Sequence, residues 1–321
     1  MAKSARTATW LVGDIGGTNA RFGLMSPRRK LLHSQVLADS DYPGIAEAIA
    51  AFLDGRGDLP APRRGAIAIA SPIAGDQVRM TNHPWRFSIE GLRRSLGFER
   101  LEIINDFTAQ ALALPHLGDG DKTRVGGGSA VAGRPLAVLG PGSGLGVSGL
   151  VPAGRKWIPL TGEGGHATMA PGDDRESAVL AHLRGRFDHV SAERCLSGPG
   201  LVNLYQALCA VDGAQAAQLT AAQITDAETA AADARCAEAS DMFCAMLGAA
   251  AGNLALTLGA QGGVYIAGGI VPRLGSRFAA SPFRARFEAK GRFRAYLAAI
   301  PTAVVTHPLA AFVGCGAALS G

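Results

Sequence analysis

Apolar residues near the start of the chain fall into two short runs, 9–12 and 20–25, that flank a polar, glycine-containing turn at 13–19. Short apolar runs around such a turn are typical of a strand hairpin. Other short runs are bounded in the same way, and the segments between them have apolar residues at helical spacing. The expected strands are 66–70 and 101–104, and the expected amphipathic helices are 44–53 and 87–96. This alternation predicts an α/β lobe at the front of the chain.

A second hairpin pattern follows a polar, glycine-rich passage that begins near residue 116. Runs 135–139 and 145–151 flank another glycine turn, and they repeat the opening pattern with Gly16 falling on Gly142. Such self-similarity indicates a duplication. At 321 residues the chain also exceeds the usual domain of roughly 100–200 residues. We therefore expect a small α/β domain at 1–115 plus 301–321, and a large α/β domain at 116–300.

The last third of the chain supplies further elements of the second lobe. An alanine-rich stretch at 219–259 predicts a helical pair, with possible capping boxes at 220–223 and 225–228 and a glycine stop at Gly259. The run 262–270 predicts a buried strand that ends in a glycine pair. The tail at 302–319 predicts a strand and a closely packed helix that returns to complete the first lobe.

Composition narrows the class of protein. Hydrophobic residues make up 48% and charged residues 18%, which supplies enough apolar surface for two cores. The net charge is +5, and the densest basic cluster, 284–294, predicts a solvated helix face rather than a nucleic-acid groove because aromatic residues are only 6%. No window approaches a membrane span of about 20 apolar residues. We expect neither a nucleic-acid nor a membrane partner.

The cysteines indicate the compartment. There are 5 cysteines, an odd number, and none forms a CxxC pair. This pattern favours neither a disulfide framework nor a zinc knuckle. We expect reduced core thiols in a cytoplasmic protein.

Two glycine-rich turns are candidates for phosphate binding, because glycines leave backbone N–H groups free to surround an anion. The residues are Gly13, Asp14, Ile15, Gly16, Gly17 and Thr18 in the first turn, and Gly142, Ser143 and Gly144 in the second. A lone glycine cluster is more often only a tight turn, and neither turn fits the P-loop pattern. Gly140 takes the place of Asp14 in the repeat, so a magnesium ion would belong to the first turn.

A polar pair follows the strand expected at 101–104. Asn105 and Asp106 stand at its carboxyl end, where open α/β sheets place their ligands. A carboxylate there can accept the proton of an alcohol that attacks phosphorus. The alternative is that Asp106 only caps a helix that begins at Phe107.

Three further polar residues suit a ligand with many hydroxyl groups. Glu163 and His166 lie on a glycine-rich loop, and Glu193 adds another carboxylate. A carboxylate can accept hydrogen bonds from several hydroxyl groups. A ligand whose hydroxyls point elsewhere leaves buried polar groups without a partner, so such a site discriminates between stereoisomers. A metal site is the competing interpretation, but Glu163 and His166 lack further ligands. Glu193 and Arg194 form a simple ion pair in the other alternative.

Together these motifs resemble the bacterial glucokinases of the hexokinase, Hsp70 and actin superfamily, over nearly the whole chain. The matching segments are 13–19, 71–73, 81–85, 104–109, 140–146, 161–166 and 266–272. The resemblance implies a two-lobed, actin-like ATPase fold of the ribonuclease H-like type, with the active site in the cleft between the lobes. It also implies ATP-dependent phosphorylation of glucose to glucose 6-phosphate in a homodimeric enzyme.

The resemblance also implies roles for individual residues. Asp106 would be the general base, and Asn105, Glu163, His166 and Glu193 would hold the sugar hydroxyls. The two glycine turns would bind the ATP phosphates, Asp14 would orient Mg²⁺ through water, and Gly268 and Gly269 would let the adenosine lie against backbone. A kinase for another hexose and a non-sugar actin-like ATPase remain alternatives.

The related ROK kinases carry a cysteine-rich zinc motif near their sugar-binding histidine. Here the residues that follow His166 are Ala-Thr-Met-Ala-Pro at 167–171, without a cysteine cluster. The comparison favours a zinc-free glucokinase. A sugar-sensing repressor on the same scaffold would need a helix-turn-helix before the first strand, where only the first eight or so residues stand.

Overall fold

The computed structural model describes residues 8–81 and 83–320. Asn82, part of the glucokinase-like segment 81–85, lies outside the described residues. The chain divides into two compact units. The first unit is Met1–Leu117 with Gly154–Thr161 and His307–Gly321, and the second unit is Gly118–Ala153 with Gly162–Thr306. The domain ranges expected from the sequence, 1–115 plus 301–321 and 116–300, stay a prediction.

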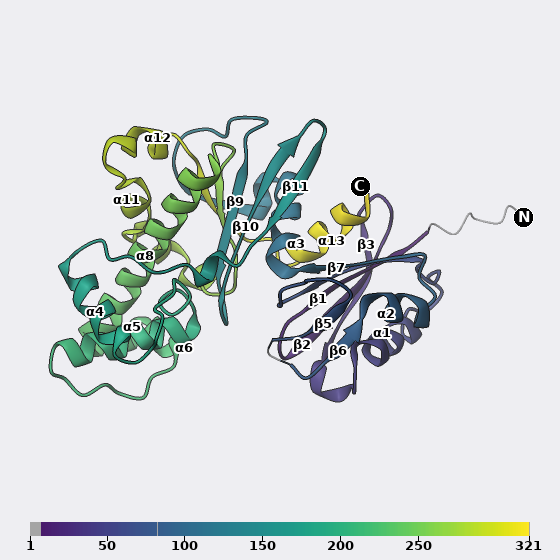
Figure 1. The fold of residues 1–321 in the computed structure, drawn as a ribbon, viewed down its shortest axis with the longest axis horizontal. Helices are drawn as coiled ribbons and strands as arrows, with labels where there is room; N and C mark the ends of the chain where they lie inside the picture. Colours follow the sequence, from purple (N-terminus) through teal and green to yellow (C-terminus); the bar gives the residue numbers. More distant parts are fainter. Residues whose placement is uncertain (1–7, 82, 321) are drawn as a thin grey trace, which may run out of the picture. The chain divides into compact units, whose positions relative to one another are not determined.

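The first unit is built on a five-stranded mixed sheet with the order β3-β2-β1-β4-β7 (Figure 1). Its strands, with the separate hairpin β5-β6, are β1 (Trp10–Ile15), β2 (Asn19–Met25), β3 (Leu31–Ala38), β4 (Arg64–Ile69), β5 (Gln77–Arg79), β6 (Arg86–Ser88) and β7 (Arg100–Asn105). β1 and β2 form the expected antiparallel hairpin. β1, β4 and β7 run parallel, with Ile15 paired to Ile69 and Ile69 to Asn105. Three strands therefore end at one edge.

Helices cover both faces of this sheet (Figure 1). They are α1 (Ile45–Asp54), α2 (Ile89–Ser95), α3 (Asp106–Ala113) and α13 (Ala310–Ser320). Leu11 of β1 belongs to the core with α1 and α2, whereas its neighbour Val12 belongs to the core with α3 and α13. The alternation along one strand thus fills two apolar layers.

Two boundaries in this unit differ from the expectation. β1 continues through Asp14 to Ile15, because Asp14 pairs with Arg21 and Ile15 with Ala20 in the ladder. Residues 86–88, partly inside the helix expected at 87–96, form β6, and α2 begins at Ile89. The Ser88 hydroxyl caps this helix by accepting the Gly91 N–H at 2.9 Å.

The second sheet repeats the arrangement of the first, in the order β11-β10-β9-β12-β13-β8. Its strands are β8 (Lys122–Gly126), β9 (Leu136–Pro141), β10 (Leu145–Ala153), β11 (Lys156–Thr161), β12 (Val264–Ile266) and β13 (Thr302–Val305). β9 and β10 form an antiparallel hairpin, and β9, β12 and β13 run parallel. The spatial repeat follows the repeat of glycine turns in the sequence.

The helices of the second unit are α4 (Asp174–Arg184), α5 (Gly198–Val211), α6 (Ala221–Ile224), α7 (Ala227–Ala232), α8 (Ala234–Leu258), α9 (Val271–Leu274), α10 (Ser276–Ala280), α11 (Phe283–Glu288) and α12 (Arg294–Ala298). The stretch expected as a helical pair is three helices, α6 to α8. The cap at Thr220 and the left-handed stop at Gly259 are confirmed. The second predicted capping box is wrong, because the Asp226 carboxylate caps α7 by accepting the Thr229 N–H at 3.0 Å.

Helix α8 corrects the membrane expectation. By length and composition it is apolar enough to cross a membrane, so the prediction that no segment approaches such a span is wrong. However, 56% of its most apolar window is buried inside the protein. Phe243, Met246 and Leu247 belong to the core of the second unit. Core packing therefore accounts for its apolar character.

The basic segment 284–294 is only in part the solvated face expected from the sequence, because Arg292 and Arg294 are exposed but Arg284 is not. Arg284 on α11 has a side chain only 15% exposed. Its guanidinium pairs with Glu288 at 2.6 Å and donates to backbone carbonyls, including those of Leu297 and Ile300. Arg284 therefore connects α11 with α12 and with the residues before β13.

All five cysteines are free and buried, as expected.

Candidate active site

The parallel strands of the first unit bring three predicted site residues to one sheet edge. Asp14 precedes the last residue of β1, Asn105 is the last residue of β7, and Asp106 opens α3. Ile15, Ile69 and Asn105 lie in register, so the turn after β1 and the start of α3 flank the end of β4. This edge is where parallel sheets present ligand-binding groups.

Asn105 is the cap of α3, a role that the alternative interpretation gave to Asp106. The side-chain oxygen Oδ1 of Asn105 accepts the N–H groups of Phe107 at 2.9 Å and Thr108 at 3.1 Å. Its Nδ2 donates to Asp106 Oδ1 at 2.9 Å and to the Ser71 carbonyl at 3.4 Å. The Asn105 side chain therefore both starts the helix and orients the neighbouring carboxylate.

Asp106 is a partly buried carboxylate with an unusual proton affinity. Its Oδ1 accepts hydrogen bonds from Asn105 Nδ2 and from the Phe107 N–H, each at 2.9 Å. Burial is the largest cause of its altered pKa, and repulsion from Asp14 adds to it, against the opposing effect of the hydrogen bonds. Together they raise the pKa of Asp106 to about 6. At neutral pH the group is a carboxylate, but a more basic one than an ordinary aspartate.

Asp14 is suited to a cation. Burial raises its pKa, although Arg21 lies near, with Nη1 3.9 Å from Asp14 Oδ2. Mg²⁺ is commonly held by one or two carboxylates and substrate phosphates. Over residues 8–81 and 83–320, no group of three or more His, Cys, Asp or Glu residues is arranged for a metal ion. The residues therefore fit a metal that arrives with a phosphate ligand, not an all-protein cage.

The first glycine turn is shorter than the sequence motif. Gly13 is buried within β1, and an added Cβ would lie 2.9 Å from Ile67 Cγ2. The Ile15 side chain is fully buried in the core. Gly17 and Thr18 are exposed, and the Gly16 N–H closes the turn on the Asn19 carbonyl at 3.1 Å. The accessible part of the motif is thus Gly16 to Thr18, beside Asp14.

In the second unit, the second turn and the predicted adenosine segment pack backbone against backbone. The Ala267 N–H donates to the Leu139 carbonyl at 2.9 Å. An added Cβ on Gly140 would lie 2.4 Å from the Ala267 carbonyl carbon, and one on Gly268 would lie 2.4 Å from the Pro141 carbonyl oxygen. This approach requires glycine at both positions, whereas a Cβ on Gly269 would meet nothing within 4 Å.

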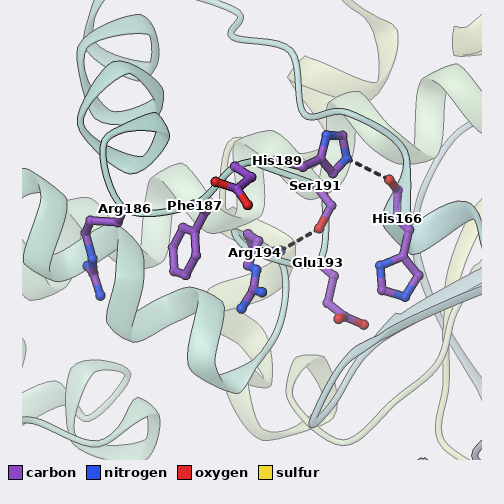
Figure 2. Close-up of a pocket in the computed structure, with 8 residues that line it drawn as sticks. His166, Arg186, Phe187, His189, Ser191, Glu193 and Arg194 are labelled. Carbon is purple, nitrogen blue, oxygen red and sulfur yellow. Dashed lines mark hydrogen bonds between the residues drawn. The ribbon is translucent and has the colours of Figure 1, made fainter.

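The sugar candidates Glu163, His166 and Glu193 also lie in the second unit. Glu163 and His166 share one turn, in which the His166 N–H donates to the Glu163 carbonyl at 3.0 Å. The Glu193 N–H donates to the Gly165 carbonyl at 2.9 Å. His189 Nε2 donates to the His166 carbonyl at 3.0 Å. Figure 2 shows the His166 ring and the Glu193 carboxylate extending to the same side of these loops.

A cavity of about 460 Å³ opens beside His166 and Glu193, whereas Glu163 is not among the residues that line it. It is lined by His166, Arg186, Phe187, Asp188, His189, Ser191, Glu193 and Arg194 (Figure 2). Arg194 stacks over Phe187, with its guanidinium carbon 4.4 Å from the ring centroid. Among the ion pairs of the described residues there is none between Glu193 and Arg194, and Glu193 Oε2 instead accepts the Leu145 N–H at 2.8 Å. The simple ion-pair alternative is therefore not what the structure shows.

Comparison with known proteins decides the family. The family model described as Glucokinase matches residues 11–321. The chain belongs to the glucokinase family. It is 55% identical over 308 residues to a glucokinase of Paramagnetospirillum magneticum, with 95% of each chain covered.

Solved glucokinase structures share the fold. A crystal structure of glucokinase from an Antarctic psychrotroph is 37% identical, has a TM-score of 0.88 and covers 97% of this chain and 98% of its own. A glucokinase from Balamuthia mandrillaris, solved in complex with glucose, is 19% identical with a TM-score of 0.79, over 99% and 95% of the two chains. The two-domain, actin-like kinase fold of the family is therefore the fold of this chain.

Sequence reasoning missed three hydrogen-bonding roles among the candidate residues of the two units. They are the capping role of Asn105, the hydrogen bond from Leu145 to Glu193, and the hydrogen bond from His189 to the His166 carbonyl. An Asn before a helix start is a known capping signal and would have predicted the first. The other two join residues distant in sequence, and no local pattern marks them.

Proposed function

We infer that the chain phosphorylates glucose with ATP to give glucose 6-phosphate. Family membership over residues 11–321 carries this inference. The observation that supports its chemistry is Asp106, a partly buried carboxylate with a pKa of about 6 at the edge where β1, β4 and β7 end. A base with this pKa is ionised at neutral pH yet accepts a proton more readily than an ordinary aspartate.

In the proposed mechanism, Asp106 accepts the proton of the sugar hydroxyl while that oxygen attacks the terminal phosphorus of ATP. One oxygen–phosphorus bond forms, the bond to the ADP oxygen breaks, and ADP leaves. Oδ1 already holds the donors from Asn105 and Phe107, so Oδ2 receives the substrate proton. Fixing the carboxylate in this way keeps it aligned without reorganisation during the reaction.

The remaining roles follow from the placement of each group. Glu163, His166 and Glu193 hold sugar hydroxyls by charge-assisted and neutral hydrogen bonds. Asn105, whose amide is occupied by the helix and by Asp106, contributes chiefly by positioning the base. The two glycine turns bind phosphates through the backbone N–H groups of Gly17, Thr18, Ser143 and Gly144. The N–H groups of Gly16 and Gly142 instead close the turns, on the Asn19 carbonyl at 3.1 Å and the Gly144 carbonyl at 2.8 Å.

Gly269, with open space beside it, faces the nucleoside. Asp14 would hold Mg²⁺, and the ion would neutralise negative charge on the phosphates.

The cysteines and the family resemblance bear on the zinc content, the compartment and the oligomeric state of the enzyme. We propose that it is a glucokinase without the zinc of ROK kinases, because the residues that follow His166, at 167–171, contain no cysteine. The resemblance also leads us to propose a cytoplasmic homodimer. Light scattering of the purified protein tests the dimer, with the mass of two 32.9 kDa chains expected.

The activity is tested by ADP release from MgATP, first without sugar and then with glucose, mannose, fructose or N-acetylglucosamine. Strong stimulation by glucose is expected. Stimulation by another of these sugars and not by glucose would make the chain a different hexose kinase. ADP release that no sugar changes would contradict a sugar kinase altogether.

A further inference from the structure

Glu193, proposed above as a sugar ligand, also contacts the second phosphate turn. Its Oε2 accepts the backbone N–H of Leu145 at 2.8 Å. Leu145 is the first residue of β10 and follows directly on Gly142, Ser143 and Gly144. A single carboxylate thus reaches from the sugar-binding loops to the turn proposed to hold phosphate.

Gly144 makes this contact possible. An added Cβ at Gly144 would lie 2.4 Å from Glu193 Oε2 and 3.2 Å from its carboxyl carbon. The φ angle of Gly144 is not in the left-handed region, so the backbone does not itself require glycine there. The close approach of the Glu193 carboxylate is therefore the structural reason for glycine at this position.

The chain segment around Glu193 connects the same two regions through its backbone. On one side, the Glu193 N–H donates to the Gly165 carbonyl at 2.9 Å, within the turn that carries His166. On the other side, the Gly198 N–H donates to the Gly142 carbonyl at 2.8 Å. The Ser197 hydroxyl, which donates to the Glu193 carbonyl at 2.8 Å, holds the segment between these ends. All of these groups belong to the second unit.

We propose that Glu193 couples the two substrates: Oε2 holds the phosphate turn through Leu145, while Oε1 accepts a sugar hydroxyl. A sugar hydroxyl on Oε1 holds the carboxylate against Leu145, and phosphates bound to the turn hold Leu145 against the carboxylate. Each ligand thus strengthens the contact on which the other depends, so the second ligand binds more tightly. The effect is reciprocal, because the sugar raises nucleotide affinity by the same factor by which the nucleotide raises sugar affinity. This coupling rests on the proposed function of the site.

The test is the dissociation constant of glucose, measured by calorimetry with and without a non-hydrolysable ATP analogue and magnesium. The ratio of the two constants is the coupling factor, and about fivefold or more is expected for the unaltered protein. Gly144→Ala places a methyl group against Glu193 Oε2 and displaces the carboxylate from Leu145 without removing its charge. The coupling factor should then fall toward one.

Gly142→Ala is the matched control, because the same methyl group in the same turn would meet no atom within 4 Å. Either methyl group can change nucleotide affinity, so the variants are compared by their coupling factors. Gly142→Ala should keep the factor of the unaltered protein. Equal factors in the two variants, or no coupling in the unaltered protein, would overturn the proposal. Failure of the unaltered protein to bind glucose at all would overturn the proposed function and the coupling with it.

Glu193→Gln separates coupling from simple sugar contact. The amide oxygen of Gln can still accept the Leu145 N–H, and the amide nitrogen can donate to the oxygen of the sugar hydroxyl. A neutral hydrogen bond then replaces the charge-assisted one, and both contacts that carry the coupling remain. We expect weaker glucose binding and a higher KM, with the coupling factor retained. Loss of the coupling factor in Glu193→Gln together with its survival in Gly144→Ala would refute the assignment of Oε2 to the turn.

Discussion

Replacement of Asn105 tests whether one side chain both starts α3 and tunes the catalytic base. Asn105→Ala removes the cap that accepts two N–H groups, at 2.9 and 3.1 Å. Loss of an Asn cap typically costs ~1 kcal/mol of folding free energy. The same change removes the Nδ2 donor to Asp106 Oδ1, whose contribution lowers the pKa of Asp106. The pKa of Asp106 should therefore rise above about 6.

Asn105→Ser separates the two effects, because a serine hydroxyl can cap the helix but does not reproduce the Nδ2 donor. Trp10, Trp85 and Trp157 all belong to the first unit, so tryptophan fluorescence during urea unfolding reports on the unit that contains α3. At pH 8, Asn105→Ala should unfold at lower urea than Asn105→Ser. Both should move the acid limb of kcat/KM to higher pH. Equal stability of the two variants, or an acid limb unchanged in both, would refute the reasoning.

Three further predictions concern the base, the sugar and a buried acid. For the unaltered protein, kcat/KM for glucose should rise with pH through an apparent pKa near 6, because Asp106 has a pKa of about 6 and must be ionised to act as the base. A kcat/KM that stays constant from pH 5 to 8 would exclude Asp106 as that base. Glu163→Gln should mainly raise the KM for glucose in steady-state kinetics, and an unchanged KM would remove Glu163 from the site. Asp39 is 1% exposed, its two carboxylate oxygens have no hydrogen-bond partner among the described residues, and burial raises its pKa. The ionised form of Asp39 therefore destabilises the fold above that pKa. At pH 8, Asp39→Asn should unfold at a higher temperature than the unaltered protein, and the difference between the two unfolding temperatures should narrow toward pH 4.

The sequence predicted the parts of the fold that local pattern controls. The hairpin of β1 and β2 and the strand β7 ending at Asn105 follow from apolar runs and glycine turns, which act over a few residues. The glycine stop of α8 at Gly259 is equally local. Boundaries failed where strand pairing rather than the apolar run decides them, as in β1, which extends to Ile15 by pairing with Ala20 of β2 and with the distant Ile69 of β4.

Contacts between residues distant in sequence escaped prediction. Gly13 was expected near phosphate, yet the Ile67 side chain explains its lack of a Cβ. Arg284 was expected in water, yet carbonyls near residue 300 surround it. The hydrogen bond from Leu145 to Glu193 joins residues 48 positions apart. Apolar spacing gives no information on such pairs, because only the folded backbone brings them together.

The most direct test of the central claim is the rate of glucose phosphorylation by Asp106→Asn. Asparagine is of nearly the same size, but it cannot accept the hydroxyl proton. We expect the rate to fall by roughly 100-fold to 10,000-fold, the contribution of a positioned general base. Calorimetry should find glucose and nucleotide binding within a few-fold of the unaltered protein. Turnover close to that of the unaltered protein would contradict the assignment of Asp106 as the base.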